Sequence, residues 1–232
     1  KIGAPIGSFW GYDAIGVYQS QEDVDNSPRV GGASGSRPGD LKFRDIDGDG
    51  AITPSDVTII GNNSPDFFYG ITNNFSYGRF SLSILGDGVQ GIQLLNGSRR
   101  NIGLVNGSYS RKDVLGRWQS PSQPGDGRTP RANVAPMGGN VSYVSSLLVE
   151  NASFFRIRNI NLRYNLPESV SKSVYLQNAA VTLSVQNALT FTPYRGYNPE
   201  QSLNGSSSLT PGVDFNGYPL ARTFTLALNL TF

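Results

Sequence analysis

Apolar and polar residues alternate along several stretches of this chain. In residues 224–232, phenylalanine and leucine occupy every second position, and threonine, alanine and asparagine lie between them. A period of two predicts a β-strand with one apolar face. The pattern recurs in residues 67–77, 80–84, 154–166 and 181–191, and more weakly in 9–18. We therefore expect about six strands.

Two of these stretches carry further detail. Residues 67–77 and 80–84 are separated only by Gly78-Arg79, which predicts a tight hairpin. In residues 154–166 the apolar positions change parity near Asn159. One extra residue in a strand produces such a change, so we expect a β-bulge there.

The connections between the expected strands alternate in length. They span about 46 residues before the hairpin, a tight turn, roughly 60 residues, about 12 and about 27. Long structureless loops are uncommon in compact soluble domains. Transmembrane β-barrels, in contrast, join their strands by short periplasmic turns and long extracellular loops.

The polar face of the strands also favours a barrel over a sandwich. It carries serine, threonine, asparagine and glutamine rather than the lysine and glutamate of a soluble surface. Tyr69, Tyr77, Phe80 and Tyr164 lie toward strand ends, where aromatic girdles are found. Because six strands do not close a wide barrel, we predict an all-β, antiparallel transmembrane β-barrel segment with long extracellular loops. A soluble β-sandwich remains the alternative.

Composition excludes several functions. The 232 residues include no histidine and no cysteine, which rules out His- or Cys-dependent catalysis, Cys/His zinc sites and disulfides. The net charge is only +2 and the basic residues are scattered, so we expect no nucleic-acid partner. Four dispersed glutamates give no support for a carboxylate-dependent hydrolase, and we predict that the protein is not an enzyme. The first ten residues hold no signal-peptide pattern and no initiator methionine, so we expect a mature product or a fragment.

Residues 45–56, with the sequence DIDGDGAITPSD, match a calcium-binding loop. The expected ligands are the side chains of Asp45, Asp47, Asp49 and Asp56 and the carbonyl of Ala51. Position twelve is aspartate rather than glutamate, and no amphipathic helix precedes the loop. We therefore predict a structural Ca²⁺ site rather than a regulatory EF-hand; a solvated Asp-Gly turn is the alternative.

The long connections are rich in aromatic residues. Such rings could stack on sugars or simply pack their own loops. They are Tyr109, Trp118, Tyr143, Tyr194, Tyr197, Phe215 and Tyr218. Together with the acidic loop, they make a calcium-stabilised, carbohydrate-binding sandwich the second functional hypothesis.

Short motifs occur in order along essentially the whole chain. They are residues 38–43 with the acidic loop, 59–62, 65–70, 117–118, 130–132, 154–160, 186–189, 196–200, 218–219 and 222–224. Together they resemble the SusC/RagA-type TonB-dependent outer-membrane transporters. The terminal aromatic residue, Phe232, also resembles the last residue of outer-membrane barrels.

The resemblance also implies an architecture, a location and partners for the whole protein. Residues 1–232 would be the C-terminal part of a barrel of about 22 strands in the outer membrane of a Gram-negative bacterium. The whole protein would import oligosaccharides or peptides, with energy from a TonB complex and with a SusD-like surface lipoprotein as a lid. Outer-membrane lipid would surround it, and the 45–56 loop would be extracellular.

Overall fold

The computed structural model describes residues 3–30, 35–99, 115–132, 143–173, 175–203, 211–215 and 217–232. The described chain is mostly strand with two short helices, α1 (Gln21–Asp25) and α3 (Glu168–Ser173), so the all-β prediction is confirmed. Within these residues no helix is long and apolar enough to cross a membrane.

The chain forms two units. The sheet unit comprises Pro65–Ile92, Asn151–Pro199 and Tyr218–Phe232, and the loop unit comprises Lys1–Ser64, Gln93–Glu150 and Glu200–Gly217. The loop unit thus collects the segment before the first long strand and most of the two long connections between later strands. The predicted long connections therefore lie mostly in the loop unit, and the predicted short connections lie in the sheet unit.

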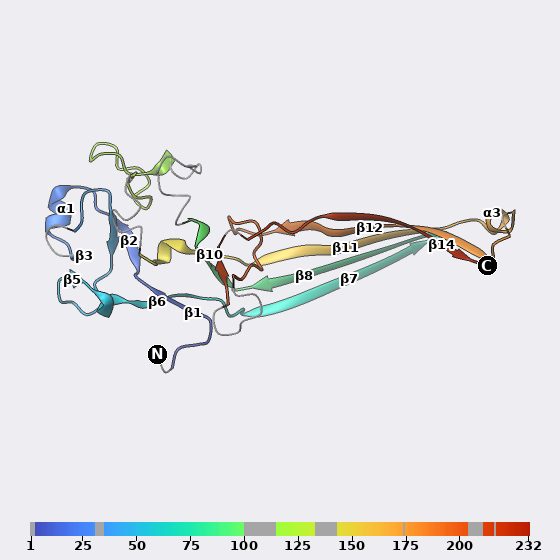
Figure 1. Cartoon of the computed structure of the whole chain (residues 1–232), viewed down its shortest axis with the longest axis horizontal. Helices are drawn as coiled ribbons and strands as arrows, with labels where there is room; N and C mark the ends of the chain where they lie inside the picture. Colours follow the sequence, from blue (N-terminus) through green and yellow to red (C-terminus); the bar gives the residue numbers. More distant parts are fainter. Residues whose placement is uncertain are drawn as a thin grey trace. The chain divides into compact units, whose positions relative to one another are not determined.

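The sheet unit is a five-stranded antiparallel sheet in which each strand pairs with its neighbours along the chain (Figure 1). Its strands are β7 (Phe67–Tyr77), β8 (Phe80–Gln90), β11 (Phe154–Asn165), β12 (Asn178–Phe191) and β14 (Thr223–Thr231). Gly78, with φ +59°, turns the chain between β7 and β8, which confirms the predicted hairpin. A 12-residue turn containing α3 joins β11 to β12.

The strand register separates an apolar face from a polar face. One row of paired residues across all five strands is entirely apolar: Phe75, Leu82, Leu162, Leu183 and Leu226. The adjacent row on the other face is entirely polar: Asn74, Ser83, Asn161, Ser184 and Thr225. The alternation in the sequence is therefore aligned in space across the whole sheet.

The predicted β-bulge is confirmed. The register of β11 shifts between Ile157 and Asn159 against both of its neighbours, so Arg158 is the extra residue. The bulge restores the apolar parity on its far side, as the sequence requires. The Arg158 guanidinium makes a two-bond ion pair with the carboxylate of Asp87 on β8, which ties the bulged strand to its neighbour.

The prediction of one strand over residues 9–18 is wrong. The segment divides into β1 (Ser8–Gly11) and β2 (Ala14–Val17), which pair with β6 (Thr58–Asn62) and β4 (Leu41–Phe43) in the loop unit. Between them, the Asp13 carboxylate accepts hydrogen bonds from Arg44 (2.8 Å) and Ser146 (3.1 Å). These contacts between distant segments interrupt the strand, and the sheet has five strands instead of six.

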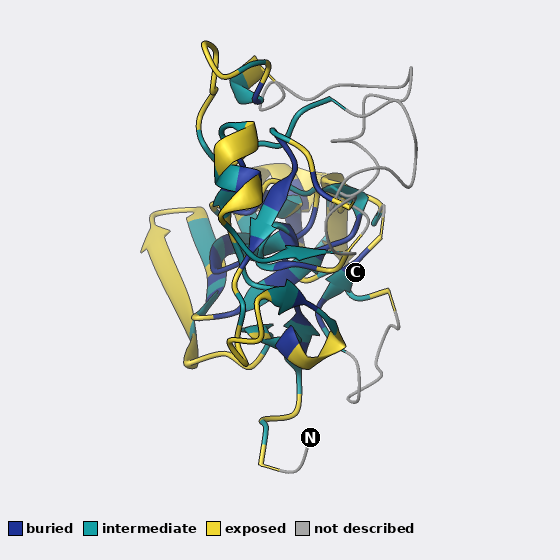
Figure 2. Cartoon of the chain, turned by 90° about the vertical axis from the view of Figure 1, so that its left-hand side faces the viewer, coloured by how far each residue is buried: buried dark blue, intermediate teal, exposed yellow. Residues whose placement is uncertain are grey.

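The loop unit has its own apolar core. Its remaining strands are β3 (Arg29–Val30), β5 (Ala51–Ile52), β9 (Gln93–Asn96), β10 (Val149–Asn151) and β13 (Val213–Asp214). The core consists of Val17, Leu41, Phe43, Ile52 and Trp118. Buried segments, dark blue in Figure 2, lie inside, and exposed segments, in yellow, lie on the outside.

Two contacts join the first long segment to the connection between β8 and β11. Arg131 Nε lies 2.8 Å from the buried Asp40 carboxylate. Gly39, at φ +85°, lies so close to the indole of Trp118 that a Cβ would approach it to 2.4 Å. The long connections are therefore a packed body, because they bury apolar surface against each other.

Candidate functional site

The acidic loop lies between β4 and β5. Single carboxylate oxygens of Asp45, Asp47 and Asp49 lie within 4.8 Å of one another. The backbone N–H groups of Gly48 and Gly50, both at positive φ, donate to Asp45 at 2.7 and 3.0 Å. The turn thereby folds three acids of the predicted ligand set around one point and offers oxygen ligands of the kind hard cations prefer.

The other two predicted ligands have structural contacts of their own. Asp56 is fully buried, and its carboxylate accepts hydrogen bonds from the N–H groups of Ile46 and Thr53, both at 2.7 Å. It completes a capping box with Thr53 and closes the loop on itself. Ala51 begins β5 and pairs with Arg29 of β3, which connects the loop to the core through the next residue.

The electrostatics of the loop differ between its acids. At Asp47 the Asp49 N–H lowers the carboxyl pKa, but partial desolvation and the carboxylates of Asp49, Asp56 and Asp45 together raise it above its ordinary value. At Asp56 burial acts to raise the carboxyl pKa, but the hydrogen bonds led by the N–H groups of Thr53 and Ile46 together outweigh it, so the pKa lies below its ordinary value. The exposed acids repel one another, whereas Asp56 is stabilised as an anion.

The second candidate site is the apolar face of the sheet. Large side chains on this face are exposed in every strand. They are Phe67, Ile71, Phe75, Tyr77, Phe80, Leu162, Leu183, Leu189, Phe191, Phe224, Leu226, Leu228 and Leu230. An apolar surface of this extent indicates contact with lipid or with another protein.

Aromatic residues gather at both ends of this face. At the end near the long connections, the rings of Tyr69 and Phe155 are parallel at 6.0 Å. At the turn end, Phe80 and Tyr164 have ring centroids 4.7 Å apart. The aromatic residues that the sequence places toward strand ends therefore form two groups. About eight residues, or roughly 26 Å of strand, lie between the groups.

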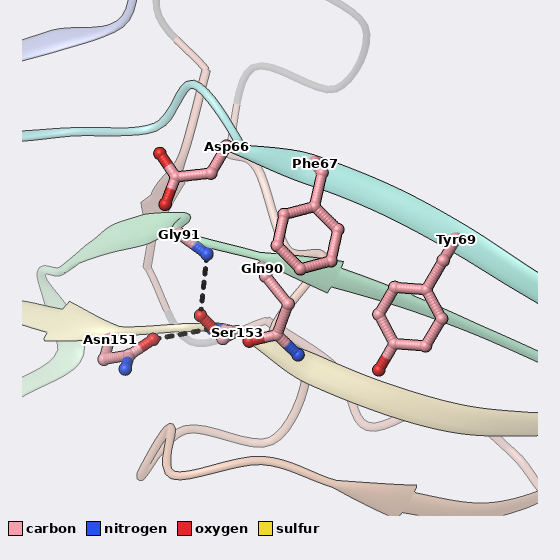
Figure 3. A pocket seen from close by; sticks show the side chains of 7 residues that line it. All are labelled: Asp66, Phe67, Tyr69, Gln90, Gly91, Asn151 and Ser153. Atoms are coloured by element: carbon pink, nitrogen blue, oxygen red, sulfur yellow. Dashed lines mark hydrogen bonds between the residues drawn. The ribbon is translucent and has the colours of Figure 1, made fainter.

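A cavity of about 640 Å³ lies at the connection end of the sheet (Figure 3). It is lined by Asp66, Phe67, Tyr69, Gln90, Gly91, Asn151 and Ser153. The Gly91 N–H donates to Ser153 Oγ at 3.0 Å, and the Ser153 N–H donates to Asn151 Oδ1 at 2.9 Å. These bonds fix one wall, while the Phe67 and Tyr69 rings form the other.

Comparisons with known proteins give a consistent result. No family model matches the chain. TonB-dependent receptor P3 of Formosa agariphila is 34% identical over 236 residues and aligns with the whole chain. TonB-dependent receptor SusC of Bacteroides thetaiotaomicron is 26% identical over 96% of the chain.

The chain corresponds over its length to part of a TonB-dependent receptor. It spans 23% of P3 and 20% of SusC. A solved structure, "Structure of the RagAB peptide transporter", has the same fold, with a TM-score of 0.71 and 21% identity over 97% of the chain and 23% of that protein. These names describe receptors and a transporter. The resemblance seen in the sequence motifs is thereby confirmed.

The aromatic residues of the long connections differ in burial. Trp118 and Tyr194 are buried and pack their own surroundings, whereas Tyr197 and Tyr218 are 77% and 86% exposed. Tyr143 and Phe215 are partly exposed, and Tyr109 lies outside the described residues.

The arginines of the polar face were not identified from the sequence pattern. Arg156 lies on β11 opposite Asp87 and Thr190, yet it is only 1% exposed. The available signal was the presence of three arginines in one strand, residues 154–165, whose polar-face neighbours are mostly uncharged. The hydrogen bond of Arg156 with Asn198, 42 positions later, leaves no signal in the strand pattern.

Proposed function

We propose that this chain forms part of the wall and outer loops of a TonB-dependent nutrient importer in the outer membrane of a Gram-negative bacterium. The observation that carries the proposal is the exposed apolar face, which is continuous across all five strands while the opposite face is polar. A barrel wall needs lipid on one side and water on the other.

Strand length and number agree with this role. A membrane-spanning strand needs about 9–11 residues, and the five strands have 11, 11, 12, 14 and 9. Five strands do not close a wide barrel by themselves, and the chain spans only 23% of the length of a relative. The outer edges of β7 and β14 would then pair with further strands of the same barrel.

The substrate and partners are proposed from the relatives. The RagAB structures are described as a peptide transporter or importer, and SusC is named as a TonB-dependent receptor. We propose that the whole protein takes up oligosaccharides or peptides, works with a TonB complex, and binds a SusD-like lipoprotein lid. The chain itself would contribute wall and loops rather than catalysis.

Fractionation of the full-length protein from its native cells tests this function. We expect recovery from the outer membrane only with detergent, as a much larger chain that co-purifies with a surface lipoprotein. Recovery as a soluble protein of about 25 kDa would overturn the proposal. The calcium-stabilised sandwich would then be the better hypothesis.

We also propose that residues 45–56 bind Ca²⁺ as a structural ion. The mutual proximity of Asp45, Asp47 and Asp49 supports this site. The raised pKa of Asp47 is the sign of crowded negative charge that a cation would relieve. Extracellular calcium modules bind with dissociation constants of about 0.1–1 mM.

Proteolysis of the full-length receptor with and without calcium tests the metal site. At a calcium concentration ten times the dissociation constant, binding adds about 1.4 kcal/mol to the stability of the loop. We expect calcium to slow cleavage about tenfold in the wild type but not in Asp47→Asn/Asp49→Asn. Asp25→Asn, at an exposed acid of α1, is the matched control and should keep the effect. Equal cleavage rates with calcium and with a chelator would contradict the site.

A further inference from the structure

The cavity at the connection end of the sheet lies on its apolar face. Phe67 and Tyr69 are both an even number of residues from Phe75 along β7, so all three share the apolar face. Phe67 also pairs with Gln90 in the register, which places Gln90 on the same face. Figure 3 shows the two rings extending from the same side of β7.

The position of the cavity along the strand sets its depth in a membrane. β7 has 11 residues, from Phe67 to Tyr77. Strands rise about 3.3 Å per residue, so its ends lie about 33 Å apart. At a tilt of about 40° this distance covers about 25 Å of the membrane, which is the height of the apolar band. The turn at Gly78 would be periplasmic, so the cavity would lie at the level of the outer-leaflet headgroups.

Two glycines of β8 let aromatic rings lie flat beside the cavity. A Cβ on Gly88 would meet the Tyr69 ring at 2.4 Å, and one on Gly86 would meet the Phe155 ring at 2.7 Å. The rings of Tyr69 and Phe155 are parallel at 6.0 Å, and the Phe191 ring follows at 6.4 Å from Phe155. We call these three rings the aromatic strip. Its smooth apolar surface offers close contact to a hydrocarbon chain.

The lining of the cavity combines rings with hydrogen-bonding groups. Besides the rings, it has the carboxylate of Asp66, the amides of Gln90 and Asn151, and the hydroxyl of Ser153. Such groups bond to sugar hydroxyls, and aromatic rings pack against the apolar faces of sugars. None of the described residues that line the cavity is a lysine or an arginine, so a phosphate would meet a carboxylate without a cationic partner. The lining therefore favours a sugar over a phosphate.

We infer that this cavity binds one glycolipid of the outer leaflet. A headgroup sugar lies against Phe67 and Tyr69 and bonds to Asp66 and Gln90, and an acyl chain of the same lipid lies along the aromatic strip. The ligand is a membrane lipid and not the transported substrate, because the apolar face does not border the lumen. The inference rests on the proposed function, since this face borders lipid only if the chain is barrel wall.

Native mass spectrometry of the delipidated full-length receptor in detergent tests the binding. The probes are deep-rough lipopolysaccharide, phosphatidylethanolamine and phosphatidylglycerol, each titrated separately. We expect one lipopolysaccharide to bind about tenfold more tightly than either phospholipid. Equal affinities for the three lipids, or tighter binding of a phospholipid, would overturn the glycolipid assignment.

Tyr69→Leu tests the placement of the sugar. The variant removes the ring but keeps an apolar side chain, and we expect it to weaken lipopolysaccharide binding about five- to tenfold. Tyr164→Leu is the matched control, because Tyr164 makes a ring pair with Phe80 at the opposite end of the face; it should bind as the wild type does. The mobility of the unheated receptor on gels checks that both variants fold. Wild-type affinity in Tyr69→Leu would overturn the site.

Asp66→Asn separates a sugar from an anionic group. The variant keeps the shape of the side chain and removes its charge. We expect lipopolysaccharide to bind about threefold more weakly, because a charged acceptor makes the stronger hydrogen bond. Unchanged or tighter binding would overturn the sugar assignment. Asp66 is exposed, so this variant also tests the site if Tyr69→Leu does not fold.

The fractionation experiment distinguishes this inference from the proposed function. Recovery of the full-length receptor without detergent would contradict both. If detergent is required and the lipid-binding results fail, only the glycolipid site is overturned.

Discussion

Replacing Leu226 by arginine should destabilise the receptor in its membrane much more than the same replacement of Thr225. Leu226 is the fourth of nine residues in β14 and faces the apolar side, 74% exposed, in register with Leu183. Thr225 is its chain neighbour on the polar face, in register with Ser184.

The expected loss of stability follows from the depth of Leu226 in the membrane. Leu226 lies three residues, or about 10 Å, from the start of its strand, which places it near the middle of an apolar band about 25 Å tall. Arginine at the bilayer midplane costs about 2–4 kcal/mol, or a 30- to 1,000-fold change in the folding equilibrium. At Thr225 the arginine would extend into water, and we expect a change of less than about 1 kcal/mol.

Leu226→Trp distinguishes lipid from a protein core. Fluid lipid accommodates the larger ring, so we expect a loss of less than about 1 kcal/mol. In a close-packed protein interior the same change would overfill the site at a cost of about 1–3 kcal/mol.

The assay is denaturant unfolding of the full-length receptor in lipid vesicles, followed by the mobility shift of the folded barrel on unheated gels. If Leu226→Arg and Thr225→Arg unfold at the same denaturant concentration, the assignment of the two faces is refuted. If Leu226→Trp is as damaging as Leu226→Arg, the apolar face packs against protein instead of lipid.

Further predictions concern the loop unit, and each is measured on the full-length receptor. Arg131→Ala leaves the carboxylate of Asp40, 3% exposed, without its 2.8 Å ion-pair partner and should cost about 3–5 kcal/mol in proteolytic stability of the loops; Lys172→Ala, at the exposed pair on α3, should change stability by less than about 1 kcal/mol. Gly39→Ala should destabilise the loops by about 1–3 kcal/mol, because its Cβ meets an indole ring at positive φ; unchanged protease resistance would contradict the packing. Because the pKa of Asp56 is lowered in the folded state, its stabilising effect is complete above the ordinary value of 3.8 and is lost as the pH falls below that value. Acid-induced loop opening should therefore be less steep in Asp56→Asn, and an identical acid profile would show that this carboxyl is not responsible.

The sequence alone determined the two-faced sheet. Alternation at period two is a local property of each strand, and the register of the five strands aligns it into one apolar and one polar face. The bulge at Arg158 was also predictable, because the apolar positions of the strand change parity there and one extra residue in a strand produces that change. The three acids of residues 45–49 were also predictable as a group, because a short glycine-containing turn brings them together whatever the remaining chain does.

Only the tertiary structure decided what the long connections do. The stretch 9–18 has an alternating pattern, but contacts of Asp13 with Arg44 and Ser146 divide it into two short strands. Arg156 is buried on the polar face, and it donates a hydrogen bond to Asn198, which lies 42 positions later in the chain. Strand periodicity carries information about the nearest neighbours in a sheet. Contacts between segments tens of residues apart leave no period in the sequence, and they become visible only when the chain is folded.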